Sequence, residues 1–374
     1  MAENSSDEYI VRFENVQKSY DGETLVVKDL NLNVDTGEFL TMLGPSGSGK
    51  TTCLMMLAGF EPATNGEIYL KNTPINKVPP HKRGIGMVFQ NYALFPHMTV
   101  AENLAFPLEV RGMNKADTEA KVKRALEMVQ LPQMAGRRPG QLSGGQAQRV
   151  AVARALVFEP DLVLMDEPLG ALDKNLREEM QYEIKHIHDS LGVSVVYVTH
   201  DQTEALTMSN RVAVFDDGII QQLAPPDELY EKPVNAFCAY FIGENNRLYG
   251  TVKEIKEGVC AVELDGSNRK VHAKQVNVDS VGDRTTLSLR PERVIVNPEG
   301  EAANNTLDGK VQELIYLGDH IRTRMRVSGN EDFVVKIPNA HGHAQLKVGE
   351  EVKLGWMTED CRALDATENA AIPD

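Results

Sequence analysis

The sequence predicts an α/β domain with a mainly parallel sheet, followed by a smaller all-β domain. Over the first two-thirds of the chain, short apolar runs alternate with amphipathic segments, a pattern typical of α/β domains. Beyond about residue 241 the helical pattern ends, and short alternating strands are interrupted by Gly, Asn and Asp. The length of 374 residues agrees with two domains, which we place at 1–240 and 241–374.

The first domain is expected to contain five buried strands and a helical insertion. One helix is expected to begin after Asp173, its N-cap, and to end at Gly192, because its apolar residues recur every three or four positions. Residues 99–160 lack strand character, and we interpret them as a helical insertion in the α/β core. The candidate strands are the apolar runs 38–44, 84–90, 161–167, 193–200 and 211–218.

The second domain contains a weak internal repeat. The segment "LYGTVKEI" from Leu248 is similar to "LDGKVQEL" from Leu307. Further along, "VGDRTTLSLRPE" from Val281 is similar to "VGEEVKLGWMTE" from Val348. Two similar β units predict a small barrel-like module built from both.

The composition argues against several classes of protein. A formal charge of −15 disfavours a nucleic-acid-binding surface, because phosphate backbones require Lys and Arg. The four cysteines show no spacing typical of a metal or redox site, which favours a reducing compartment. The sequence has no secretory signal pattern, and no apolar run approaches the roughly 20 residues needed to cross a bilayer. We therefore expect any membrane role to come from partner proteins.

A glycine-rich loop is the strongest candidate binding site. The run "GPSGSGKT" at 44–51 matches G-x-x-x-x-G-K-[ST], follows an apolar run and precedes a helical segment, as a phosphate-binding P-loop requires. Its N–H groups are expected to surround phosphate oxygens, with Lys50 reaching the β- and γ-phosphates and the Thr51 hydroxyl holding Mg²⁺. The alternative is a glycine-rich turn that binds nothing. The candidate residues are Gly44, Pro45, Ser46, Gly47, Ser48, Gly49, Lys50, Thr51 and Thr52.

Polar residues stand just past four of the apolar runs, where the carboxyl ends of parallel strands form a ligand-binding edge. At that edge Asp166 would bind Mg²⁺, and Glu167 would orient or deprotonate an attacking water. Gln90 could contact Mg²⁺ or that water, and His200 could contact the γ-phosphate. Tyr20, before the first core strand, could stack on adenine. Taken singly, each is also explained as an ordinary polar or aromatic residue at a strand end.

A second anion-binding helix start lies nearly a hundred residues after the P-loop. Ser143, Gly144, Gly145 and Gln146 stand at the start of a run rich in the helix-forming residues Ala, Arg, Gln and Leu. Bare amides and the positive end of the helix dipole suit an anion. A single nucleotide does not need two such sites.

Taken in order, these motifs resemble those of the nucleotide-binding subunit of an ABC transporter. The matching runs, within residues 8–240, are Tyr20, "GPSGSGKTT", "MVFQ", "LSGGQ", "LVLMDEP", "GALD" and "VTHD". The resemblance implies a P-loop NTPase cassette that binds ATP and Mg²⁺ and works as a head-to-tail homodimer. In that arrangement Ser143, Gly144, Gly145 and Gln146 face the ATP of the partner copy, and Asp173 belongs to the D-loop. Ala147 and Gly170 depart from the Gln and Ser that are more frequent there.

The second domain resembles the OB-fold (TOBE-like) extension of importer ATPases of the maltose and polyamine class. The matching runs are "FIGENN", "LSLRPERV" and "YLGDHIRTRMRV". The resemblance implies a peripheral ATPase subunit at the cytoplasmic face of the inner membrane, with two integral membrane permease subunits and a periplasmic solute-binding protein. Residues 89–104 would receive helices of the permeases. The C-terminal domain would pack the dimer or sense a regulatory ligand.

The transported solute is indicated by few residues. The runs "FIGENN" and "LGALDKNLREEM" favour the spermidine/putrescine branch. Importers for sugar, glycerol phosphate or ferric iron share the architecture and stay alternatives, whereas the C-terminal β module and the lack of fused membrane helices disfavour an exporter cassette. In another class, soluble ABC ATPases act on DNA or in translation; a single cassette, no long heptad run and the acidic charge disfavour that reading, so no nucleic-acid partner is expected.

Overall fold

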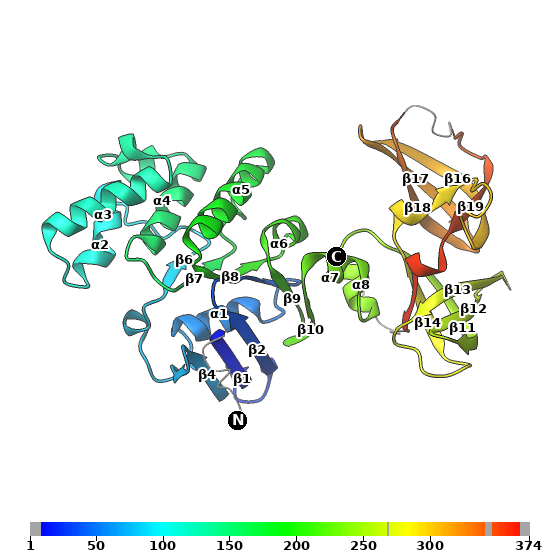
Figure 1. Ribbon diagram of the computed structural model, residues 1–374, viewed down its shortest axis with the longest axis horizontal. Helices are drawn as coiled ribbons and strands as arrows, with labels where there is room; N and C mark the ends of the chain where they lie inside the picture. The colour runs from blue at the N-terminus through cyan, green and yellow to red at the C-terminus, as the bar shows by residue number, and fades with distance from the viewer. Residues whose placement is uncertain (1–8, 268, 341–345, 367–374) are drawn as a thin grey trace, which may run out of the picture. The chain divides into compact units, whose positions relative to one another are not determined.

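The computed structural model describes residues 9–267, 269–340 and 346–366. The chain divides into two compact units, Met1–Leu229 and Tyr230–Asp374, whose elements are labelled in Figure 1. Each unit has hydrophobic core of its own.

The unit boundary lies slightly before the one expected after residue 240. The short helix α8 (Ala236–Phe241) continues the helical texture of the preceding sequence. Its residues Ala236 and Ala239 nevertheless pack against Leu364, in the last strand of the second unit. The helical pattern in the sequence therefore extends past residue 229, where the first compact unit ends.

The first unit is built on a six-stranded, mainly parallel sheet with the strand order β10-β9-β3-β8-β7-β6. Neighbours from β9 to β6 run parallel, and β10 pairs antiparallel with β9. Because β3, β7 and β8 are buried along their whole length, they are mostly apolar runs in the sequence. The expected strand runs are thereby confirmed. The strands are β3 (Phe39–Leu43), β6 (Gly86–Val88), β7 (Leu162–Asp166), β8 (Ser194–Thr199), β9 (Arg211–Asp216) and β10 (Ile219–Ala224).

A four-stranded antiparallel sheet, which we did not expect from the sequence, packs on the helix α1 (Lys50–Ala58). The parallel sheet packs on the same helix from its opposite side. One hydrophobic cluster contains Phe13 of this sheet, Leu54 of α1 and Val196 of the parallel sheet. Helix α1 is therefore buried between two sheets, which agrees with the apolar residues around most of its circumference. The strands, in the order β2-β1-β4-β5, are β1 (Tyr9–Ser19), β2 (Leu25–Asp35), β4 (Asn65–Leu70) and β5 (Thr73–Pro74).

Helices cover the opposite face of the parallel sheet. Alternate residues of β8 enter two different clusters, Val196 in the cluster with α1 and Val195 and Tyr197 in a cluster with the helices, as side chains on opposite faces of a strand must. In the described residues, the segment 99–160 contains helices and 3₁₀ turns and no strand. None of the helices in the described ranges is long and apolar enough to cross a membrane. The remaining helices are α2 (Val100–Glu109), α3 (Lys115–Met128), α4 (Gly144–Leu156), α5 (Lys174–Leu191), α6 (Gln202–Met208) and α7 (Pro226–Glu231), with 3₁₀ turns η2 (Pro80–Lys82), η3 (Pro132–Met134) and η4 (Pro139–Gln141).

Helix α5 has the ends that its sequence predicts. The Asp173 side chain accepts a hydrogen bond from the backbone N–H of Leu176, 3.1 Å away, as an N-cap does. Gly192 ends the helix with a φ of 64°, in the left-handed region that favours glycine.

After α8, the second unit contains a closed five-stranded barrel and a five-stranded sheet, each built mainly from one copy of the internal repeat. The last strand of each copy is exchanged: β15 pairs with β19 of the other sheet, and β20 closes the barrel beside β13 and β14. A single hydrophobic cluster, with Trp356 and Phe333 fully buried, spans both. The expected module built from both repeats is confirmed. Its strands are β11 (Asn246–Lys256), β12 (Val259–Leu264), β13 (Lys270–Gln275), β14 (Arg284–Leu289), β15 (Ile295–Val296), β16 (Asn305–Tyr316), β17 (His320–Val327), β18 (Asn330–Pro338), β19 (Glu351–Trp356) and β20 (Cys361–Asp365), with 3₁₀ turns η5 (Pro291–Arg293) and η6 (Thr358–Asp360).

Candidate nucleotide-binding site

The P-loop connects β3 to α1 and is closed around its own lysine. The Lys50 ammonium donates hydrogen bonds to the carbonyl oxygens of Gly44 (2.9 Å) and Pro45 (2.8 Å) and lies 3.3 Å from the Ser48 hydroxyl. Burial lowers the pKa of Lys50, and the nearby carboxylates of Glu167 and Asp166 oppose that shift. A cation held by neutral carbonyl and hydroxyl oxygens of the loop can exchange them for the oxygens of an anion.

The P-loop needs glycine at particular positions. A Cβ atom at Gly44 would lie 2.3 Å from the Phe215 carbonyl oxygen, and one at Gly49 would lie 2.9 Å from the Val26 carbonyl oxygen. Gly49 also has a φ of 99°. The loop therefore packs too closely on its neighbouring strands for a larger residue.

Thr51 and Asp166 form a pair at the start of α1. The Thr51 hydroxyl donates to the Asp166 carboxylate over 3.1 Å, and Asp166 is 8% exposed at the end of β7. Burial raises the pKa of Asp166, whereas the Thr51 hydrogen bond and the Lys50 charge lower it. The pair presents hydroxyl and carboxylate oxygens side by side.

Glu167 is the point at which the predicted catalytic residues meet. Its Oε2 atom accepts a hydrogen bond from Gln90 Nε2 at 3.2 Å and lies 3.3 Å from His200 Nδ1. Its backbone has a φ of 42°, a left-handed conformation that a non-glycine residue rarely adopts, and its N–H donates to the Val198 carbonyl. The turn after β7 thus holds the carboxylate between residues that follow β6 and β8.

Tyr20 lies beside the P-loop helix. Tyr20 is 59% exposed, and its hydroxyl is 3.5 Å from the Thr52 hydroxyl in α1. The Lys18 ammonium lies 4.6 Å from the ring centroid. The exposed ring is available to a planar ligand next to the loop.

The residues Ser143, Gly144, Gly145 and Gln146 of the "LSGGQ" run, which we call the signature, form a closed N-terminal cap on α4. Ser143 Oγ accepts from the Gln146 N–H (3.3 Å), and Gln146 Oε1 accepts from the Ser143 N–H (3.0 Å). A Cβ at Gly145 would lie 2.9 Å from Leu176, so α4 packs closely against the start of α5. In the described residues, no hydrogen bond or ion pair joins Ser143, Gly144, Gly145 or Gln146 to the P-loop or to Glu167. The structure therefore brings Gln90, Glu167 and His200 together beside the P-loop, and it leaves the signature apart from them. Asp173 caps α5 instead.

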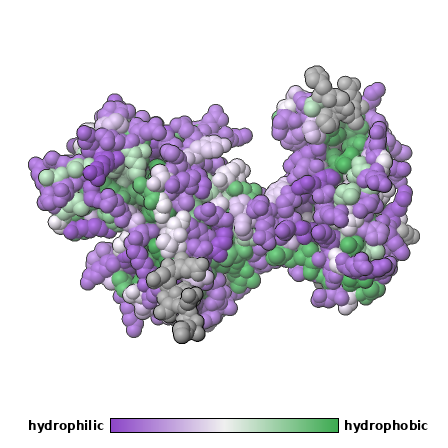
Figure 2. All heavy atoms as spheres, in the orientation of Figure 1, coloured by the Kyte–Doolittle hydropathy of each residue, from purple (hydrophilic) through white to green (hydrophobic). Residues whose placement is uncertain are grey.

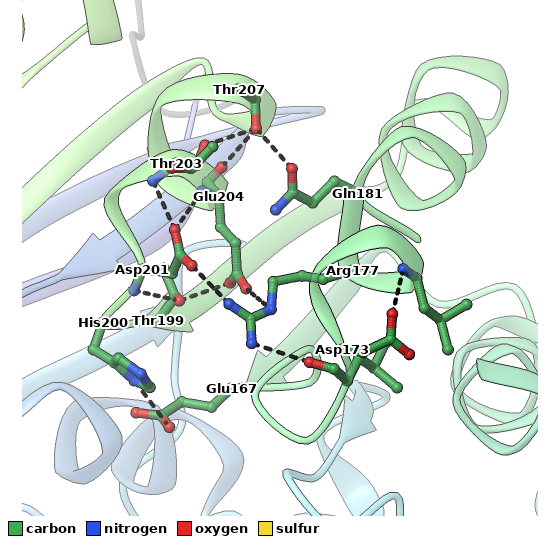
Figure 3. A network of polar contacts seen from close by, with 12 residues as sticks. Glu167, Asp173, Arg177, Gln181, Thr199, His200, Asp201, Thr203, Glu204 and Thr207 are labelled. Atoms are coloured by element: carbon green, nitrogen blue, oxygen red, sulfur yellow. Dashed lines mark hydrogen bonds and ion pairs between the residues drawn. The ribbon is translucent and has the colours of Figure 1, made fainter. Parts of the chain in front are cut away.

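Two arginines that the sequence analysis missed hold the loops of the site. Arg154, on α4, donates to the carbonyl oxygens of Tyr92 (2.9 Å) and Ala93 (2.8 Å), in the loop after Gln90. Tyr92 and Ala93 both have positive φ, at 62° and 46°, so this loop is strained and needs external support. Arg177 belongs to the network in Figure 3, between Asp173 and His200. Neither arginine has a sequence spacing that reveals its contacts.

Comparison with family models gives two matches. Residues 27–170 match the model described as ABC transporter, and residues 287–364 match the model described as TOBE domain. The first match contains the P-loop, Gln90, the signature and Glu167, and the second runs from β14 to β20.

Relatives resemble the chain over nearly its whole length. The spermidine/putrescine import ATP-binding protein PotA of Rubrobacter xylanophilus is 44% identical over 356 residues, 95% of this chain and 93% of the relative. An uncharacterized ABC transporter ATP-binding protein of Escherichia coli, YdcT, is 42% identical and covers 93% of this chain and 96% of its own length. Among solved structures, the dimeric ATP-binding cassette MJ0796 bound to ADP and Pi has a TM-score of 0.53 at 36% identity, covering 58% of this chain and 98% of that one.

Proposed function

Because this chain belongs to the ABC transporter family, as its relatives at over 40% identity establish, we propose that it is the ATP-hydrolysing subunit of an importer for polyamines of the spermidine and putrescine class. The observation that carries the enzymatic part is the meeting of Gln90 and His200 on the Glu167 carboxylate beside a P-loop. The names of the relatives support the polyamine cargo.

ATP and Mg²⁺ fit the residues present. Bound ATP would place its phosphates on the P-loop amides and on Lys50, with adenine on the exposed ring of Tyr20. Thr51, Asp166 and Gln90 offer the oxygen ligands that Mg²⁺ prefers, and the ion would neutralise phosphate charge. In the described residues no cluster of three His, Cys, Asp or Glu could hold a metal alone, so phosphate oxygens would complete the coordination.

Glu167 is proposed to act as the general base for the attacking water. Its carboxylate takes the proton from the water. Gln90 and His200 hold that carboxylate in its orientation through contacts of 3.2 and 3.3 Å. Lys50 leaves its loop carbonyls and binds the phosphate charge. These groups lie at the carboxyl ends of β3, β6, β7 and β8, where ligands of open α/β sheets bind.

A second copy of the chain is proposed to complete each site. The signature residues do not contact the P-loop of their own chain, yet their α4 helix start suits an anion. A head-to-tail homodimer would place Ser143, Gly144, Gly145 and Gln146 against the γ-phosphate on the partner's P-loop. The dimeric cassette among the structural neighbours supports this arrangement.

Mixed dimers test this composite site. In one sample, Lys50→Ala and Ser143→Arg are carried by different chains; in the other, both are carried by one chain paired with a wild-type chain. If the sites are composite, the first dimer keeps one intact site and the second keeps none, so ATP turnover is higher in the first. Higher turnover in the second dimer would show that each chain uses its own signature.

The membrane subunits are proposed to dock on a groove between α2 and α3, next to the segment 89–104. The groove has a volume of about 610 Å³ and an apolar floor that includes Ala105, Val122 and Leu126. Figure 2 shows hydrophobic side chains reaching the surface over α2 and α3, among hydrophilic ones. Such a groove fits the apolar face of a helix. On this proposal the subunit is peripheral, at the cytoplasmic face of the inner membrane, and a periplasmic solute-binding protein delivers the cargo to the permeases.

Charge placed in the groove should separate docking from hydrolysis. Ala105→Arg is expected to lower co-purification with the permeases at least tenfold, because a guanidinium would be desolvated in the apolar floor. The ATPase activity of the isolated subunit should stay within about twofold of wild type, since the groove is lined by α2, α3 and residues next to them in the chain and includes none of the residues proposed to act in hydrolysis. Ala120→Arg is the matched control, because Ala120 is exposed on α3 and does not line the groove. Normal assembly of the Ala105→Arg protein would contradict this docking site.

Uptake measurements test the cargo. Cells that lack this gene are expected to lose most uptake of labelled spermidine and putrescine and to regain it with the wild-type chain but not with Lys50→Ala. If cells without the gene take up polyamines normally but lose uptake of sugar, glycerol phosphate or ferric iron, the proposed polyamine cargo is wrong and the proposed ATPase function stands. An active ATPase that forms no complex with any permease in cells and supports uptake of none of these solutes would favour a soluble ABC ATPase.

A further inference from the structure

Arg177 lies between two loops that the reaction uses. We call residues 170–173 the D-loop segment and His200–Asp201 the H-loop segment. The Arg177 guanidinium, from the first turn of α5, donates to the Leu172 carbonyl oxygen at 3.1 Å and to the Asp201 carboxylate at 3.1 Å. Figure 3 shows Arg177 between Asp173 on one side and Asp201 and Glu204 on the other.

The Asp201 carboxylate is fixed on several sides. Its Oδ1 atom accepts from the N–H groups of Thr203 (2.8 Å) and Glu204 (3.2 Å) and so caps α6, while Oδ2 accepts from Arg177. The Asp201 N–H donates to the Thr199 hydroxyl at 3.0 Å. Since His200 lies between Thr199 and Asp201, these contacts set the position of its backbone.

A buried glutamate holds the other side of the guanidinium. Glu204 is 2% exposed and accepts hydrogen bonds from the hydroxyls of Tyr197 and Thr199, each at 2.7 Å. Its second oxygen lies 4.0 Å from Arg177 Nε, a buried nitrogen with no hydrogen-bond partner. Arg177 is therefore a single cation facing two carboxylates, and its orientation is determined by both.

We propose that Arg177 is a positioning residue that makes the D-loop and H-loop segments move together. A displacement of the D-loop segment would then shift Asp201 and His200, and with them the contact between His200 and Glu167. This inference rests on the proposed ATPase function. The guanidinium suits the role because its fixed fork reaches a carbonyl and a carboxylate at once, which an ammonium cannot do with the same geometry.

The surface of the D-loop segment indicates what would displace it. Gly170, Ala171 and Asp173 are exposed, whereas Leu172, whose carbonyl Arg177 holds, is buried. A second copy of this chain that touches the exposed residues would push on a segment anchored to the H-loop. Arg177 would thus report contact with the partner copy to the catalytic carboxylate.

A double-mutant cycle tests this link. Arg177→Met keeps the aliphatic stem and removes both hydrogen bonds; we expect kcat for ATP to fall about 10- to 100-fold, as misplacement of a catalytic group does, with KM within about twofold. If Arg177 acts through His200, adding Arg177→Met to His200→Ala lowers kcat no further than His200→Ala alone. Lys185→Met is the matched control on α5, because the Lys185–Asp189 pair touches neither segment; its kcat should be unchanged.

The outcomes separate this inference from the proposed function. Absence of ATP turnover in the wild-type chain would remove the proposed function itself. The Arg177 link alone would be overturned if His200→Ala lowers turnover but the double variant loses the product of the two single-variant factors, because the two residues would then act independently. Arg177→Lys keeps the charge and serves if Arg177→Met unfolds, as judged by thermal unfolding; it should show the same split between kcat and KM. A rise in KM with unchanged kcat would likewise overturn the link.

Discussion

Replacing Glu167 by glutamine is expected to lower ATP turnover by at least about 10²-fold and to leave ATP binding intact. A glutamine side chain has the same size and can still contact Gln90 and His200, but it cannot take a proton from water, and a general base contributes roughly 10²- to 10⁴-fold. The left-handed backbone at this position is unchanged by the substitution. Steady-state hydrolysis and ATP titration measure the two effects separately.

The same variant should accumulate as a dimer. If ATP lies between two copies and hydrolysis releases them, blocking hydrolysis traps the dimer, which size-exclusion chromatography with ATP would detect. Glu178→Gln is the matched control, because Glu178 is exposed on α5 and outside the site. This variant should hydrolyse ATP at the wild-type rate and show the same monomer–dimer distribution as wild type. A Glu167→Gln chain that remains monomeric with saturating ATP would contradict the composite site.

Replacing Lys50 by alanine is expected to abolish measurable turnover and to weaken ATP binding at least tenfold. The Lys50 ammonium is the cation in the P-loop, and removing a group that stabilises phosphate charge in a partly buried site costs about 10²- to 10³-fold in rate. Folding should tolerate the change, because burial already disfavours the charged form of Lys50 and lowers its pKa. Calorimetric titration with ATP and thermal unfolding provide the two readouts.

The matched control is Lys71→Ala, whose side chain is 58% exposed and pairs with Asp161. An exposed pair of this kind contributes little, so nucleotide binding and turnover should stay as in wild type. Wild-type affinity for ATP in the Lys50→Ala chain would show that phosphate is held elsewhere.

The strands of the parallel sheet and the residues at their ends were predictable from local pattern. A strand buried on both faces, such as β7, must be apolar along its length, so the polar Asp166 and Glu167 at its end stand out. The antiparallel sheet was harder to predict. The pairing of β1 with β2 shifts register at several points, including between Phe13 and Val16, which disturbs the alternation that identifies a strand.

The supporting arginines could not be predicted because their contacts depend on tertiary structure. Arg177 and Asp201 are joined by packing of α5 against the loop after β8, and Arg154 reaches a loop that precedes it by some sixty residues. From the sequence alone, an arginine on a helix is expected to be a solvent-exposed side chain. Only the fold shows which carbonyl or carboxylate each one meets.

The exchanged strands in the second unit restrict how this chain can be shortened. A protein ending after β19 would lose β20, so β13 and β14 would become open edges that invite pairing with foreign strands and aggregation. Removing the first repeat instead would take β15 away from β19. Each half therefore depends on a strand that the other half supplies, so we expect only the whole module to be transferable to another protein as a folded unit.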